Sequence, residues 1–240
     1  RMDALWLHIV QWLHTVGLHV DAGTAREVAG GMAQVTQKLD MPSLLALAAA
    51  LGWASGFRLY AVVFIVGLMG ATGLLALPAG LHMLENPLVL AVAGCLMLVE
   101  FFADKVPWID SAWDAVHTVI RVPGGALLAA GVFGADNATM GVIAGLLGGS
   151  LAATSMATKM TTRAAVNTSP EPFSNWGLSF FEDGLVVAVV WLATQHPVAF
   201  GIALVAMVVV SVLLLVVLFQ FLRAVLRRVS RFFSGSPGVA

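Results

Sequence analysis

The sequence predicts an all-α integral membrane protein with about six transmembrane helices. Apolar residues make up 60% of the 240 residues and charged residues only 10%, whereas soluble domains carry about 25% charged residues. The mean hydropathy of the chain is +0.94. The chain also contains several runs of about 20 mostly apolar residues, the length that a helix needs to cross the hydrocarbon core of a bilayer.

The N-terminal segment, residues 1–42, is predicted to be helical and to lie at the membrane interface. Residues 4–20 are apolar on one side of a helix, and polar residues recur at helical spacing on the other side, namely His8, Gln11 and Thr15. This pattern is typical of an amphipathic interfacial helix. A T-x-x-E capping box at 24–27 predicts that a short polar helix follows. The sequence leaves the role of the histidines in this segment open.

Six apolar segments follow in the predicted transmembrane domain, residues 43–222. They are 44–72, 87–103, 112–133, 138–158, 174–194 and 198–222. The first is long and contains Gly52, Gly56 and Arg58, so we expect it to be strongly tilted or broken into two half-helices. The third contains Pro123, which should kink it. The last residues, 223–240, form a predicted basic cytoplasmic tail.

Lysines and arginines predict how these segments are oriented, because loops with an excess of positive charge remain on the cytoplasmic side. The chain has 12 Lys and Arg residues, of which Arg58 and Arg121 lie within spans. If the N-terminus is inside, all the others fall on the inner side. We therefore expect both termini to be cytoplasmic.

Three spans in each half predict an inverted repeat, a common plan in transporters. Small residues recur at four-residue spacing in the first span, at Ala48, Gly52 and Gly56, and in the fourth, at Gly141, Gly145, Gly149, Ala153 and Ala157. Such stripes allow helix backbones to approach closely in lipid. We expect the glycine stripe of the fourth span to contact the first span. Ordinary packing without symmetry is the alternative.

Ionisable side chains at membrane depth supply the candidate site, since each costs about 2.5 to 3.5 kcal/mol to insert and such residues usually have a function. The candidates for binding an ion or proton are Glu100, Asp104, Asp110, Asp114, Glu182 and Asp183, with Asn175 and Ser179. The candidates for counter-ions or gates are Arg58, Lys105, Arg121, Lys159 and Arg163. We expect the carboxylates to line one polar cavity, open toward the cytoplasm, together with Arg121 and Arg163.

The chemistry of these residues favours a small transporter or channel for a cation or a proton-coupled solute. The carboxylates outnumber the cations, and amide and hydroxyl groups add oxygen ligands of the kind that hard cations prefer. An anionic-solute site on the cations is one alternative. Another is a non-transporting membrane scaffold or lipid-interacting module, in which the charges form a structural network.

The sequence argues against several other classes of protein. It contains no G-x-S-x-G or H-E-x-x-H motif, so we expect no enzyme activity and no cofactor. The net charge of −1 provides no basic field for nucleic acid, and Cys95 is the only cysteine. The expected partners are the lipid bilayer and an ion or small solute, and a homo-oligomer remains open.

Three segments carry a resemblance to a known family. They are VEFFADKVPWIDSAWDAVHTVIRVPGGALLAA at 99–130, GGSLAATSMATKMTTRAAVNTSPEPFSN at 148–175 and SFFEDG at 179–184. Their E-x-x-x-D-K-V-P and S-P-E-P-F-S-N runs resemble the signature segments of a bacterial membrane-protein family catalogued as domain-of-unknown-function family 4126, over roughly residues 44–195. The resemblance implies a multi-pass protein of the bacterial inner membrane and supplies no substrate.

Overall fold

A computed structural model describes residues 40–134, 137–168 and 173–233 of the chain. Its elements are α3 (Met41–Ala71), the short 3-10 helix η1 (Ala79–Glu85), α4 (Pro87–Ala103), α5 (Pro107–Gly131), α6 (Ala138–Val166), α7 (Phe173–Gln195) and α8 (Pro197–Phe233). The described part of the chain contains no strand, as the sequence predicted. The interfacial helix predicted at 4–20 and the capping box at 24–27 lie outside the described residues.

Each of the six predicted apolar segments coincides with a helix, but not every helix has the properties of a membrane span. Four are long and apolar enough to cross a bilayer, namely α3, α6, α7 and residues 197–228 of α8. A fifth span results if η1 and α4, which meet at an angle of 69°, count as one. Helix α5 is not among them, because Asp110, Asp114 and Arg121 interrupt its apolar residues. Six membrane spans are therefore not confirmed.

Short polar side chains determine where several of these helices begin. The carboxylate of Asp40 accepts a hydrogen bond from the backbone N–H of Ser43 at 3.0 Å, at the start of α3. Asn86 does the same for Leu88 at 2.9 Å, one residue before the proline that begins α4. Asn and Asp are preferred caps because their oxygens satisfy N–H groups that have no partner within the helix, and proline fits the first turn.

Helix α3 is broken at Arg58, whose backbone angles of φ −148° and ψ 82° are not helical. Before the break, α3 packs along α6, because Gly52 lies against Gly148 and Gly56 against Ser155. This half of α3 runs in the same direction as α6. Of the two possibilities expected for the first span, a strong tilt or a break, the structure shows the break.

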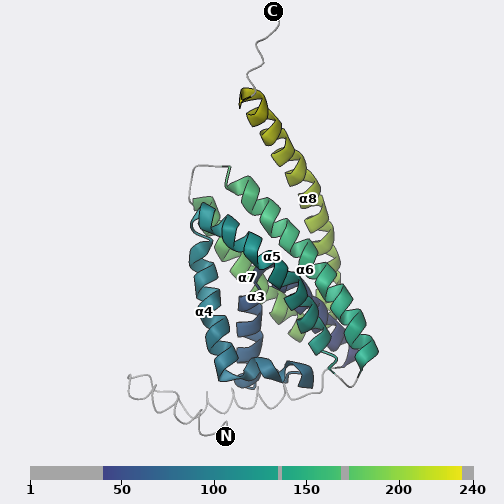
Figure 1. The fold of residues 1–240 in the computed structure, drawn as a ribbon. Coiled ribbons are helices and arrows are strands. Elements are labelled where there is room, and N and C mark those ends of the chain that lie inside the picture. Colours follow the sequence, from purple (N-terminus) through teal and green to yellow (C-terminus); the bar gives the residue numbers. More distant parts are fainter. Residues whose placement is uncertain (1–39, 135–136, 169–172, 234–240) are drawn as a thin grey trace, which may run out of the picture.

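After the break, α3 runs back along α4. Gly67 lies against the Leu84 carbonyl and the Leu90 side chain, and Phe64 lies against Gly94, so this half is antiparallel to α4. Helices α4 and α6 point the same way, because each is antiparallel to α5. The two halves of α3 therefore run in opposing directions, with Arg58 at the tip of the bend (Figure 1).

This geometry makes α3 a sharply bent pair of half-helices. At 1.5 Å per residue the two halves are roughly 25 Å and 20 Å long, each shorter than the hydrocarbon core of about 30 Å. Met41 therefore lies at the η1 end of the bundle, opposite the turn at 104–106 (Figure 1). The first half of α3 and α6 run parallel, whereas an inverted repeat would oppose them, and the repeat is not confirmed. The side of the membrane on which residues 1–39 lie stays a prediction.

Small residues on α6 form close helix contacts on two faces. Gly145 and Gly149 pack against Ala126 of α5, so the partner that we predicted for this stripe, the first span, is wrong. Gly148 packs between Gly52 of α3 and Ala129 of α5, where a Cβ atom has no room. Consecutive residues of a helix point about 100° apart. The stripe of Gly145 and Gly149 therefore contacts α5, whereas the neighbouring Gly148 also reaches α3.

Candidate functional site

Ten ionisable side chains gather around the break in α3 and form what we call the charge cluster. Its four cations are Arg58, Arg121, Lys159 and Arg163, and its six carboxylates are Glu100, Asp104, Asp110, Asp114, Glu182 and Asp183. All are buried except Asp183, whose side chain is 34% exposed. Five helices and one turn supply its members from positions far apart in the sequence: α3, α4, the turn after α4, α5, α6 and α7.

Arg58 joins α3 to α7 and to the turn that follows α4. Its Nη2 donates to a carboxylate oxygen of Asp104 and, at 2.7 Å, to the hydroxyl of Ser179. Its Nε lies 2.8 Å from Oδ1 of Asp183. The break in the helix thus places a guanidinium at the point where three segments meet.

Arg163 of α6 makes the most complete pairing in the cluster. Its Nε and Nη2 donate to the two carboxylate oxygens of Glu182 at 3.2 and 2.8 Å, a two-pronged arrangement that matches the planar guanidinium. Nη2 also lies 3.1 Å from Oδ2 of Asp104, and Nη1 donates to the Asp104 backbone carbonyl at 3.1 Å. These contacts tie α6 to α7 and to the turn after α4.

Arg121 of α5 is held by two carboxylates. One of them, Asp114, lies seven residues earlier on the same helix face and accepts a hydrogen bond from Nη1 at 2.7 Å. The other is Glu100 of α4, which accepts from Nη2. Arg121 therefore joins α5 to α4.

Lys159 lies at the centre of the charge cluster and is 1% exposed. Its Nζ is 3.4 to 3.9 Å from the nearest oxygens of four carboxylates, which are Asp114, Glu182, Glu100 and Asp104. Its one hydrogen bond in the described part of the chain goes to the backbone carbonyl of Phe57, at 3.2 Å, immediately before the break in α3. The ammonium therefore balances several charges at once and belongs to no single pair.

The carboxylates are less completely satisfied than the cations. Both oxygens of Asp110 are buried and make no hydrogen bond to the described residues, and Oδ1 lies 3.8 Å from Nη1 of Arg163. One oxygen each of Glu100, Asp104 and Asp114 also lacks a hydrogen bond there. Six carboxylates facing four cations leave two negative charges without compensation if all are ionised. Because a buried unpaired charge is costly, the cluster favours binding protons or cations.

Two predicted site residues lie apart from the charge cluster. Lys105 has its Nζ 3.0 Å from the centre of the Phe101 ring and donates to the Phe101 carbonyl at 2.9 Å. Partial burial lowers the pKa of the Lys105 ammonium from its ordinary value, and the positive charge of Arg58 adds to this effect. Asn175 is buried and donates to the side chain of Asn167 at 2.8 Å. Neither residue pairs with a carboxylate of the cluster, whereas Ser179 contacts Arg58 directly.

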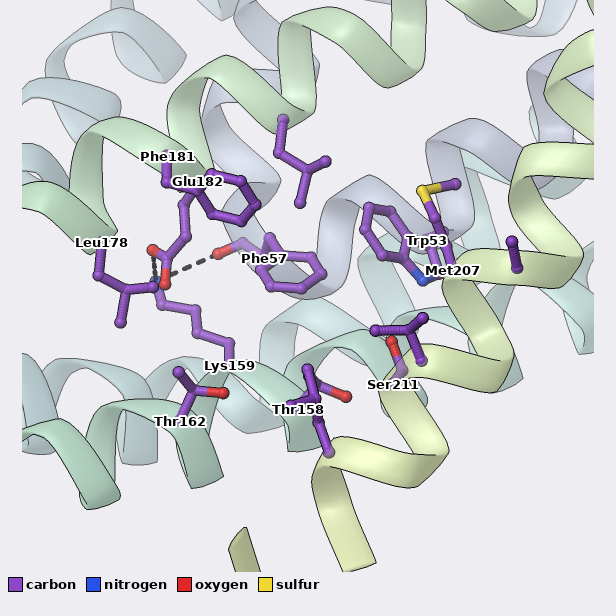
Figure 2. Close-up of a pocket in the computed structure, with 14 residues that line it drawn as sticks. Trp53, Phe57, Thr158, Lys159, Thr162, Leu178, Phe181, Glu182, Met207 and Ser211 are labelled. Atoms are coloured by element: carbon purple, nitrogen blue, oxygen red, sulfur yellow. Dashed lines mark hydrogen bonds and ion pairs between the residues drawn. The ribbon is translucent and has the colours of Figure 1, made fainter. Parts of the chain in front are cut away.

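A cavity of about 320 Å³ reaches the charge cluster from the side of the bundle, between α3, α6, α7 and α8 (Figure 2). Lys159 and Glu182 lie at one end of it, and its other walls are almost wholly apolar. Of the charged residues predicted for the site, Lys159 and Glu182 line this cavity. The charged side chains turn toward one another because pairing compensates for their removal from water.

Sequence reasoning did not identify two further features of the site. Ser155 donates to the Trp53 carbonyl at 2.6 Å, in the close contact of α6 with α3. His117 stacks on Trp113 at 4.0 Å between ring centres and meets the ring edge of Tyr60 at 5.5 Å. The position of Ser155 among small residues of α6 could have indicated its contact with α3. The ring contacts of His117 depend on tertiary packing and could not be predicted from the sequence.

No curated protein and no solved structure matches the chain. Among the described residues, no group of His, Cys, Asp and Glu has an arrangement that could hold a metal ion. The sequence profile of one family, described as a domain of unknown function (DUF4126), matches residues 45–217. This match includes every residue of the charge cluster, and the chain belongs to the DUF4126 family.

Proposed function

We propose that the chain is a small membrane transporter in which the charge cluster binds a proton or cation whose movement is coupled to transport. The observation that carries this proposal is the carboxylate of Asp110, which is buried without a hydrogen bond to the described residues and 3.8 Å from its nearest cation. Ionisable groups at membrane depth commonly form proton relays. A broken helix within the bundle is also a recurring feature of transporter binding sites.

A physical coupling follows from the position of Asp110. When ionised, its carboxylate attracts Arg163, which also holds Glu182 of α7 and Asp104 after α4. Protonation removes that attraction and leaves Arg163 paired with the other two carboxylates. The force between α5 and α6 therefore depends on whether a proton occupies Asp110, and a switch of this kind is what coupling between a proton and a conformational change requires.

We place the protein in a bacterial inner membrane with the turn at 104–106 on the cytoplasmic side. Lys105 lies at that turn, and Arg223, Arg227 and Arg228 lie toward the far end of α8, at the same end of the bundle (Figure 1). Positive charges near span ends favour the cytoplasmic face. The C-terminal tail is then cytoplasmic as well.

The experiment is a flux measurement in proteoliposomes with an imposed proton gradient, read by an internal pH dye. Asp110→Asn should abolish gradient-driven proton movement while the protein remains folded. Asp40→Asn is the matched control, because Asp40 is exposed at the start of α3 and lies outside the cluster. Unchanged flux through a folded Asp110→Asn protein would contradict the proposal.

A structural role for the network is the second candidate, and the pairing of the cations favours it. Each of the four cations lies within 4.0 Å of at least two carboxylates. In a non-transporting scaffold these pairs would only hold helices together. The wild-type protein would then carry no gradient-dependent flux under any tested ion, and Asp110→Asn would alter neither flux nor fold.

A further inference from the structure

The cavity described above opens toward the bilayer. Two of its lining residues, Phe181 of α7 and Val210 of α8, are 62% and 52% exposed, whereas Trp53, Phe57 and Ser211 deeper within it are almost completely buried. The candidate span of α8 has a mean hydropathy of 3.4 and is largely exposed within the chain. A surface this apolar is covered by lipid in a membrane, so the mouth of the cavity is accessible from the hydrocarbon layer.

Two buried polar groups in the cavity wall have no partner in the described part of the chain. The indole Nε1 of Trp53 makes no hydrogen bond, and neither does the hydroxyl of Ser211, a residue only 3% exposed. In Figure 2 both lie near Met207, away from Lys159 and Glu182. Buried tryptophan N–H groups usually find an acceptor, and a serine within a helix commonly bonds to the preceding turn. These two donors are therefore available to a bound molecule.

The charged end of the cavity is unfavourable for a charged ligand. Glu182 is already held by Arg163 through both oxygens, and Lys159 lies among four carboxylates. A cationic head group would meet Lys159 in the cavity wall, while an anionic one would meet Glu182 and the excess of carboxylates behind it. Both would raise the cost of a buried charge, so an uncharged molecule fits best.

We propose that this cavity binds an uncharged, mainly apolar molecule that enters from the bilayer and carries one hydrogen-bond acceptor oxygen, held by the Trp53 indole N–H and the Ser211 hydroxyl. The volume of about 320 Å³ lies at the lower end of the range for small-molecule sites. Met207, beside Trp53 in Figure 2, has a flexible side chain that can move to admit such a molecule. This inference goes beyond the proposed transport, and binding is measured without any gradient, so each can fail while the other stands.

Photolabelling of the purified protein in liposomes tests the proposal with three probes. The first is hexadecanol bearing a diazirine in its chain, the second is the corresponding diazirine hexadecane without the oxygen, and the third is phosphatidylcholine with a diazirine acyl chain. Mass spectrometry then locates the label. We expect the alcohol to label residues 178–185 of α7 and 206–214 of α8 more strongly than the alkane does. Strong labelling of the same segments by the phospholipid would identify a bilayer lipid as the source of the ligand, and its absence would identify a free solute.

Matched variants separate specific binding from contact with bulk lipid. Ala206→Phe fills the cavity from α8 and should reduce labelling at least tenfold, while Val209→Phe on the lipid-facing side of α8, 52% exposed and not in the cavity wall, should leave it unchanged. Ser211→Ala should reduce labelling by the alcohol about fivefold, the effect of one ordinary hydrogen bond, and leave the alkane unaffected. Equal labelling by alcohol and alkane in all variants, or labelling insensitive to Ala206→Phe, would overturn the proposal.

Discussion

Glu182→Gln and Asp110→Asn each remove one negative charge from the charge cluster and nearly preserve side-chain volume. Both residues are almost completely buried, at 1% and 0% exposed. They differ in how they are paired. Glu182 accepts two hydrogen bonds from Arg163 and lies 3.5 Å from Lys159, whereas Asp110 makes no hydrogen bond to the described residues and lies 3.8 Å from Arg163.

The pairing determines the magnitude of each effect. Removing one partner from a buried ion pair costs about 3 to 5 kcal/mol, because the other charge remains buried without compensation. We expect that loss for Glu182→Gln, since Arg163 and Lys159 both depend on it. Asp110→Asn should change the free energy of unfolding by about 1 kcal/mol or less, because desolvation of an unpaired carboxylate offsets its weak attraction to Arg163.

Reversible unfolding in mixed detergent micelles, followed by helical circular dichroism, measures both free energies under the same conditions. The difference between the two variants is more informative than either value, because effects on the unfolded state largely cancel between two amide substitutions. Equal losses for both variants would refute the reasoning, since the pairing geometry would then have no energetic consequence. A larger loss for Asp110→Asn would also exclude it as the exchangeable proton site.

Two further predictions concern the fold. Gly148→Ala should lower the free energy of unfolding by about 1 to 3 kcal/mol, because its new Cβ would overlap that of Ala129. The control is Gly184→Ala, which has nothing within 4 Å of its Cβ position and should be neutral or stabilising through helix propensity. Similar melting temperatures for the two variants would contradict the close contact at Gly148. In a Cys95→Ala background, cysteines replacing Met41 and Met83 should react with an impermeant maleimide from one side of the membrane and a cysteine replacing Val106 from the other. Reaction of positions 41 and 106 from the same side would contradict the reversal of direction within α3.

The helix positions could be predicted from the sequence because they depend on local properties. Each apolar run became a helix, and the helix starts agree best where an asparagine side chain caps the helix locally, as at Asn86 and Asn137. The charge cluster was predictable for a related reason. Side chains such as Arg58 and Glu182 cannot face lipid, so the energetic cost alone requires them to meet inside the bundle.

Features that depend on tertiary partners could not be predicted. The break at Arg58 was signalled by the residues around it, but the reversal of direction depends on Asp104 and Ser179, which hold the guanidinium from distant segments. Gly148 contacts α3 and Gly149 does not, and this difference depends on how α6 is rotated about its own axis. The apolar cavity was also missed, because it results from how α8 packs beside α6 and α7.

The bend in α3 has a consequence for how the chain is made. Arg58 is synthesised 46 residues before Asp104 and 121 residues before Ser179. At a translation rate of about 5 to 20 residues per second, its first partner follows after roughly 2 to 9 s and the α7 partners after roughly 6 to 24 s. During that interval the tip of α3 carries an uncompensated cation, which favours its retention near water or the insertion machinery. Loss of Asp104 should therefore reduce the yield of inserted protein, in addition to the stability that is lost when a partner of buried cations is removed.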